Sequence, residues 1–172
     1  MQIGNRDLKL IIFFLLFIIG GIIAGFSKDF IESNRALNIT FKSCILPVVA
    51  MSAYFAYQST FDTRKQVALW RRVLSMIVLT FIFGMMFLKA TQGYIIFYNC
   101  KIGEQKQTVV KGEVVKLKYP KNKKPLNNYS IEIKLIEKDL ITLDVPTNEY
   151  YIGQTFEKDM IKGSLGILYS PY

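Results

Sequence analysis

Serine and lysine are the residue types with which this chain could perform nucleophilic chemistry. The 172-residue sequence contains no histidine, so it lacks the commonest general base and the commonest metal ligand. A serine nucleophile would need a lysine as its base, and Lys42-Ser43 and Lys162-Gly163-Ser164 are the candidate arrangements. Composition alone suggests them. We therefore expect a protein that is not an enzyme, with no catalytic residue, no metal ligand and no cofactor.

Two cysteines, Cys44 and Cys100, could carry out redox chemistry. Cys44 lies at the start of one long apolar run and Cys100 follows another, so a disulfide is possible if both lie on the outer side of a membrane. Two cysteines without a Cys-x-x-Cys motif define neither a disulfide framework nor a metal site. Free structural thiols are the alternative, and the pairing stays open.

The elements that carry these residues divide near Asn99 into an apolar half and a polar half. Three uncharged runs precede that point, at residues 10–26, 43–61 and 73–88. Each is close to the length that a helix needs to cross a hydrocarbon core. We predict a transmembrane helical domain over residues 1–98, with spans at about 10–27, 43–61 and 73–94. A soluble β domain is expected over residues 99–172.

The second run is the least apolar of the three. It carries Pro47 near its start, and the first turn of a helix tolerates proline. A re-entrant hairpin is the alternative to a span at this run. At the N-terminus, Arg6 and Lys9 followed by an apolar run also fit a signal peptide, so cleavage of residues 1–27 is a further alternative.

Positive charges between the runs predict the orientation of the chain. With three spans, the N-terminal flank and the connection before the third run share one side, and they carry six Lys or Arg. The connection between the first two runs carries three. Positive flanks favour the cytoplasm. We expect a protein of the bacterial inner (cell) membrane with a cytoplasmic N-terminus and an extracytoplasmic C-terminal domain. If the second run does not span, that domain lies in the cytoplasm.

Small residues spaced four apart in each run predict how the helices pack. In lipid, such residues let helix backbones approach closely. The pairs are Gly21 with Gly25, Ser52 with Ala56, and Thr80 with Gly84. They predict a packed bundle, or a homo-oligomer formed through the Gly21 and Gly25 face. The only charged residue within a predicted span is Lys89, at an interface, which argues against a transport path through a single chain.

The polar half alternates between apolar and polar side chains, as antiparallel strands do. We predict strands at residues 107–119, 129–136, 140–145, 150–156 and 163–170. Gly112 is expected to mark a bulge, and the second and third strands to pair with Leu135 opposite Ile141 and Ile133 opposite Leu143. Five short strands predict a small, partly closed OB-like or SH3-like barrel, with an open antiparallel sheet as the alternative. The fold class is therefore an α+β membrane protein.

Tyrosines and lysines of the polar half form a possible partner surface. Its members are Tyr119, Lys121, Lys123, Lys124, Tyr150 and Tyr151. An OB-like barrel suggests nucleic-acid binding by analogy, but a lysine-rich turn is usually solvated surface. We expect the lipid bilayer and a protein partner or second copy of the chain, with no nucleic acid and no small-molecule substrate.

The layout of a short membrane bundle followed by a small terminal barrel resembles that of the NfeD-like membrane proteins. The resemblance is one of architecture and transfers no residue. From the residues, we expect a membrane-anchored binding or scaffold protein without catalysis. A bacterial membrane immunity or accessory protein that neutralises a toxin is the alternative, and an oligomeric channel is a lesser one.

Overall fold

The chain forms two compact units, each assembled from two separate stretches of sequence. The computed structural model describes residues 5–25, 30–61, 68–118, 129–136 and 139–170. The first unit contains residues 1–25 and 39–94, and the second contains residues 26–38 and 95–172. The chain therefore leaves the second unit within the second helix and returns to it within the third.

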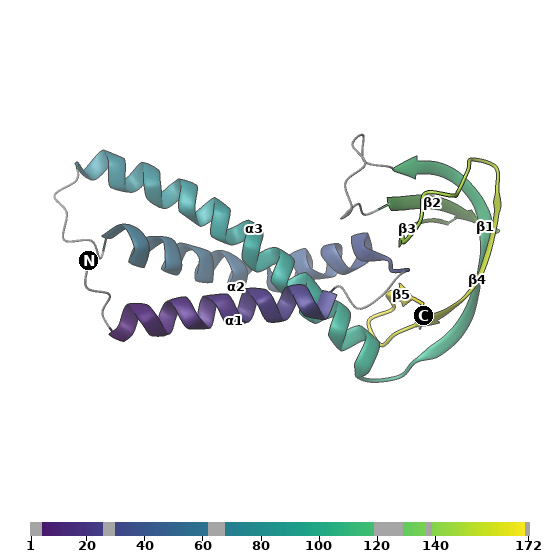
Figure 1. Ribbon diagram of the computed structural model, residues 1–172, viewed down its shortest axis with the longest axis horizontal. Coiled ribbons are helices and arrows are strands. Elements are labelled where there is room, and N and C mark those ends of the chain that lie inside the picture. The colour runs from purple at the N-terminus through teal and green to yellow at the C-terminus, as the bar shows by residue number, and fades with distance from the viewer. Residues whose placement is uncertain (1–4, 26–29, 62–67, 119–128, 137–138, 171–172) are drawn as a thin grey trace. The chain divides into compact units, whose positions relative to one another are not determined.

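Three long helices account for the apolar half of the sequence (Figure 1). They are α1 (Asn5–Gly25), α2 (Ser33–Phe61) and α3 (Leu69–Lys101). All three are long and apolar enough to cross a membrane. Large apolar side chains are exposed on each, including Leu16 at 67%, Leu46 at 80% and Phe81 at 72%. Because water would penalise such surfaces, these helices are those of a membrane protein.

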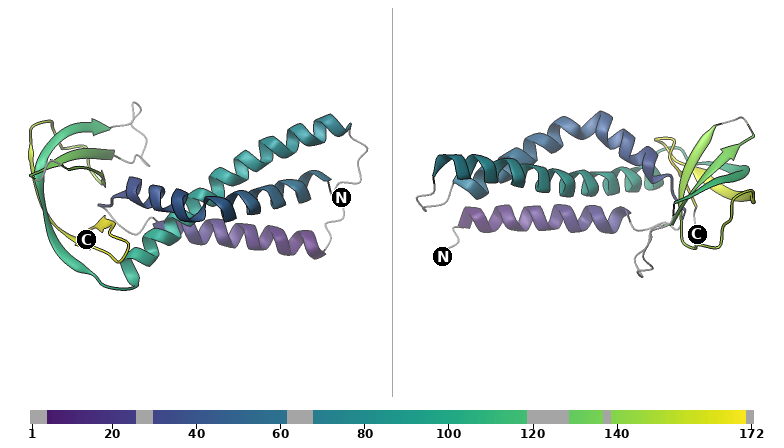
Figure 2. Two further views of the ribbon diagram at one scale, coloured as in Figure 1. Left: turned by 180° about the vertical axis from the view of Figure 1, so that it is seen from behind. Right: turned by 90° about the horizontal axis from the view of Figure 1, so that it is seen from above.

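Helix α2 differs from the prediction at its N-terminal end. It begins at Ser33, ten residues before the predicted start, so Pro47 lies inside the helix rather than in its first turn. Proline removes one backbone hydrogen bond and its ring crowds the preceding turn, which bends a helix. Figure 2 shows α2 bent in the view from above.

Aromatic rings fill the interior of the helical unit. The ring of Phe14 lies 5.4 Å from those of Phe83 and Phe87 in edge-on geometry, and 5.6 Å from that of Phe55 (centroid distances). Phe87 is buried almost completely. Offset and edge-on ring pairs add to the stabilisation that buried area gives. One cluster of phenylalanines therefore joins α1, α2 and α3.

The polar half forms one five-stranded antiparallel sheet, as the predicted α+β class requires. Its strands are β1 (Lys106–Lys118), β2 (Tyr129–Leu135), β3 (Leu140–Val145), β4 (Thr155–Lys162) and β5 (Leu168–Tyr169). Their order across the sheet is β3-β2-β1-β4-β5. The long strand β1 curves so that its first part pairs with β4 and its last part with β2 (Figures 1 and 2).

The predicted pairing of β2 with β3 is wrong by two residues. Ile133 lies opposite Ile141, and Ile131 lies opposite Leu143. The turn is closed by a hydrogen bond from the Leu135 amide to the Asp139 carbonyl. A shift of two residues keeps every apolar side chain on the same face, so hydrophobic alternation cannot distinguish the two registers.

Other strand predictions are also corrected, and the fifth strand, expected at residues 163–170, spans only Leu168–Tyr169. The fourth strand was expected at residues 150–156 but begins at Thr155, because Gly153 adopts a φ of 87° and turns the chain before it. The bulge of β1 falls between Val114 and Lys116 rather than at Gly112. Gly112 is needed for another reason, since a Cβ there would collide with the Lys134 carbonyl of β2.

Candidate functional site

The serine–lysine candidates lie on the surface of the two units. Lys42 and Ser43 are exposed on α2, and Lys162 and Ser164 are exposed at the end of β4 and in the turn that follows it. Among the described residues, no group of three or more His, Cys, Asp or Glu could hold a metal ion. Cys44 and Cys100 do not form a disulfide.

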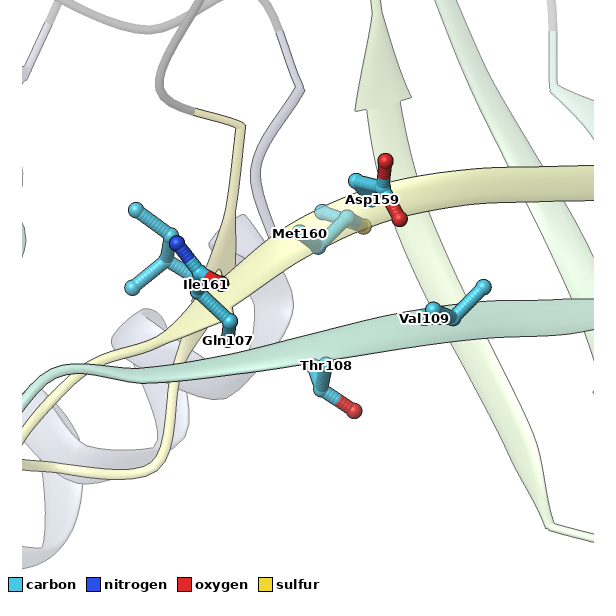
Figure 3. A pocket seen from close by; sticks show the side chains of 6 residues that line it. All are labelled: Gln107, Thr108, Val109, Asp159, Met160 and Ile161. Carbon is cyan, nitrogen blue, oxygen red and sulfur yellow. The ribbon is translucent and has the colours of Figure 1, made fainter.

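A hollow of about 380 Å³ lies along β1 and β4 (Figure 3). It is lined by Gln107, Thr108, Val109, Asp159, Met160 and Ile161. Asp159 is the only ionisable residue among them. A ligand site usually combines an apolar cleft with several converging polar groups, which this lining does not supply.

The predicted partner surface is only partly placed by the structure. Tyr151 is 64% exposed in the turn before β4. Tyr150 packs instead against the core, with its ring 6.0 Å from that of Phe156. Tyr119, Lys121, Lys123 and Lys124 lie outside the described residues. Tyr150 and Tyr151 therefore do not form a common outward-facing pair.

The predicted small residues of α1 face α3 of the same chain. A Cβ at Gly21 would overlap the backbone of Ala90, and one at Gly25 would lie 3.2 Å from the Cα of Gly93. A Cβ at Gly93 would in turn overlap the carbonyl oxygen of Gly21. The glycine face of α1 is therefore already covered within one chain.

The other predicted small residues lie on α2 and α3. Ser52 is buried, and a Cβ at Gly84 would meet its Oγ at 3.6 Å. The Ser52 hydroxyl donates to the Val48 carbonyl at 2.6 Å. Ala56 is fully buried, and Thr80 donates a hydrogen bond back to its own helix.

The most unusual feature of the β unit is a short segment that precedes α2 and is therefore distant in sequence from the strands with which it pairs. Residues 30–32, which precede α2 and are called the strap here, lie between β3 and β5. Ile31 forms antiparallel bridges with Asp144 of β3 and with Tyr169 of β5. The strap thus joins the two edge strands of the sheet and closes it.

Backbone hydrogen bonds hold the strap on both sides. On the β3 side, the Ile31 amide donates to the Asp144 carbonyl at 3.3 Å, and the Asp144 amide donates back at 2.8 Å. On the β5 side, the Glu32 amide donates to the Leu168 carbonyl at 3.0 Å, and the Ser170 amide donates to the Phe30 carbonyl at 2.9 Å. An edge strand otherwise leaves such groups without protein partners.

The strap side chains are buried and belong to the core of the β unit. Phe30 is 8% exposed and packs in the cluster that contains Val114, Ile133 and Phe156. The Lys158 ammonium lies 4.1 Å from the centre of the Phe30 ring, which is cation–π geometry. The strap is therefore part of the hydrophobic core.

Glu32 anchors the strap through a partly desolvated carboxylate. Its Oε2 accepts a hydrogen bond from the Leu168 amide at 3.4 Å and lies 4.0 Å from the Arg35 guanidinium. Burial raises the pKa of Glu32 above its ordinary value, although Arg35, the Leu168 amide and Lys162 oppose that rise. The charged form of this group is therefore disfavoured in the folded unit.

Asn99, at the end of α3, organises the turn between β4 and β5. Its Oδ1 accepts hydrogen bonds from the Leu165 and Ile167 amides at 3.0 and 3.3 Å, and its Nδ2 donates to the Ile167 carbonyl at 3.0 Å. The Asn99 side chain is fully buried, and a Cβ at Gly163 would collide with it. One side chain thus satisfies three backbone groups of this turn.

Sequence reasoning missed the strap and the role of Asn99. The strap is too short to show a strand period, and the apolar Phe30-Ile31 pair beside a charged residue was its only signal. For Asn99, the sequence offered no signal, because its partners at Leu165 and Ile167 lie more than sixty residues away. Comparison with family models, with curated proteins and with solved structures finds no match to this chain.

Proposed function

We propose that this protein is a non-catalytic membrane anchor that presents its β unit outside the cytoplasm to a protein partner. The strap is the observation that carries the proposal. Because residues 30–32 and β1 to β5 form one sheet, the α1–α2 connection and the C-terminal part of the chain lie on the same side of the membrane. The chain must then cross the bilayer an even number of times between Glu32 and Asn99.

This parity supports a span by α2, the least apolar of the three helices. Helix α3 contains a long uncharged run whose exposed face is apolar, as a lipid-facing helix requires. If α3 crosses, α2 must cross as well. A re-entrant α2 would separate the strap from the sheet by a bilayer. The six positive residues on the other side then favour an extracytoplasmic β unit.

The strand order favours an OB-like barrel over an SH3-like one. The curved β1 pairs with both β2 and β4, and the strap fills the gap between β3 and β5. Function still follows from the surface rather than from the fold. Exposed apolar side chains on separate parts of the unit, among them Val109, Ile136 and Tyr151, offer alternative contact points for a protein.

Site-specific photocrosslinking in intact cells tests the proposal. The crosslinking amino acid replaces Val109, Ile136 or Tyr151 singly, and replacement of lipid-facing Leu16 in α1 is the control. We expect one protein to be captured from one β-unit position and not from Leu16. Substituting a neighbouring exposed residue, such as Ile152→Ser beside Tyr151, should reduce that capture, by about tenfold or more if Ile152 is a central contact of the interface.

Each result of this experiment has a defined meaning. Capture of a second copy of the chain would replace the partner by a homo-oligomer. Absence of a specific product at all three β-unit positions would contradict the binding proposal. Sidedness is measured separately with a membrane-impermeant thiol reagent and Tyr151→Cys, because the native Cys100 is only partly exposed.

A further inference from the structure

The strap precedes α2, the least apolar of the three membrane helices, in the sequence. Helix α2 follows the strap directly, at Ser33. It contains Pro47 within its length, and Arg35 and Lys42 lie in its first turns. Charged residues and an interior proline both lower the tendency of a helix to insert. The strap is therefore attached to the crossing that most needs stabilisation.

A chain in which α2 does not cross cannot close its sheet. In that chain the strap stays on one side of the bilayer and β1 to β5 fold on the other. The backbone groups of Asp144, Leu168 and Ser170 then lose their hydrogen bonds to the strap. The space occupied by Phe30 in the core also opens. Unpaired edges and exposed core surface promote proteolysis and aggregation.

We propose that docking of the strap into the β3–β5 gap drives α2 across the membrane, so that closure of the sheet and the three-span topology stabilise each other. The inference rests on the membrane topology of the proposed function but not on the identity of any partner. Closure of the sheet raises the equilibrium constant for α2 crossing, and crossing raises the equilibrium constant for closure by the same factor. Burial of one phenylalanine side chain alone corresponds to about 10- to 100-fold in an equilibrium constant.

A matched pair of substitutions at Ile31 tests this coupling. Ile31→Pro removes the amide that donates to Asp144, whereas Ile31→Val keeps that amide and a branched apolar side chain. Both are introduced into a Cys44→Ser, Cys100→Ser background. Single reporter cysteines replace Leu69, which is 70% exposed at the start of α3, or Tyr151.

The chains are synthesised into inverted inner-membrane vesicles and labelled with an impermeant maleimide from the side of synthesis. A chain whose α2 has crossed exposes the cysteine at 69 and protects the one at 151, and an uncrossed chain shows the reverse. We expect Ile31→Pro to raise labelling at 151 at least about fivefold and to lower labelling at 69, the smallest change expected of an allosteric coupling. Ile31→Val should stay within about twofold of the parent.

Other outcomes overturn the inference. If Ile31→Pro makes the β unit protease-sensitive but leaves both labelling ratios unchanged, closure does not drive crossing. If the unit stays protease-resistant, the strap is not required for closure. A parent chain labelled at 151 and protected at 69 would refute the topology and both proposals. Failure to capture a partner by photocrosslinking would refute the binding proposal alone.

Discussion

Replacing Asn99 by alanine should strongly destabilise the β unit. The side chain is fully buried and makes three hydrogen bonds to the turn before β5. Asn99→Ala leaves the Leu165 and Ile167 amides without these partners, while the Ile167 carbonyl still accepts a hydrogen bond from the Gly163 amide. Each buried backbone group that loses its partner costs about 1–3 kcal/mol, less where water can enter.

The expected loss is about 4 kcal/mol of unfolding free energy, taking the two amides at the middle of that range. A small domain has only about 5–15 kcal/mol in total, so a large part of its stability depends on this residue. The turn leads directly into β5, and residues 168–170 form the hydrogen bonds that hold one side of the strap. We therefore expect the strap seam between β3 and β5 to open first in the variant.

Native-state hydrogen exchange of the full chain in detergent micelles measures this effect. The amides of Asp144 and Ser170, which lie in the seam, should exchange faster in Asn99→Ala by about two to three powers of ten, the equivalent of the expected free energy. Asn38→Ala, an exposed asparagine of α2, is the matched control and should stay within about 0.5 kcal/mol of the parent. A loss below about 1 kcal/mol for Asn99→Ala would refute the reasoning.

Two further predictions concern the helical unit and the strap. Gly93→Ala should destabilise the packing of α1 against α3, because its Cβ would overlap the Gly21 carbonyl, whereas Gly84→Ala meets only an ordinary contact and should be neutral or stabilising by up to about 1 kcal/mol. Thermal unfolding in detergent compares the two, and equal effects would contradict the packing argument. The raised pKa of Glu32 means that its contribution to stability is fully present below pH 4.5 and is lost as the pH rises through the raised pKa. Glu32→Gln should flatten this part of the pH dependence of unfolding, and an unchanged slope would contradict the assignment to Glu32.

The pH prediction has the opposite sign to that of a typical salt-bridged carboxylate. Glu132 illustrates the usual case, since a hydrogen bond from Lys118 lowers its pKa. A carboxylate whose pKa is lowered by folding stabilises the folded state, and this stabilisation is lost as the pH falls through the lowered pKa. Glu32 differs because burial outweighs its favourable partners. Glu32 and Glu132 therefore change the free energy of unfolding in opposite directions as the pH rises, and single substitutions are needed to separate the two contributions.

The sequence by itself predicted three long apolar helices followed by an antiparallel sheet, and the structure contains both. Three long uncharged runs predict helices in an apolar environment, because backbone N–H and C=O groups in lipid need hydrogen bonds that a helix supplies within itself. The alternating pattern of residues 129–145 likewise requires strands with one buried face, as β2 and β3 show. Small residues such as Gly21 and Ser52 indicated helix faces but not the helices that they contact.

Only the tertiary structure decided how the β unit is completed. The strap and the side-chain bonds of Asn99 join residues more than sixty positions apart, and no local period encodes such contacts. The register of β2 against β3 was also undetermined, since a two-residue shift preserves the buried face and only the turn at Leu135 selects one pairing. The tertiary structure also bears on the second crossing. Residues that precede α2 and residues that follow α3 belong to one sheet, so both must lie on the same side of the membrane. We therefore expect α2 to cross the membrane if α3 does.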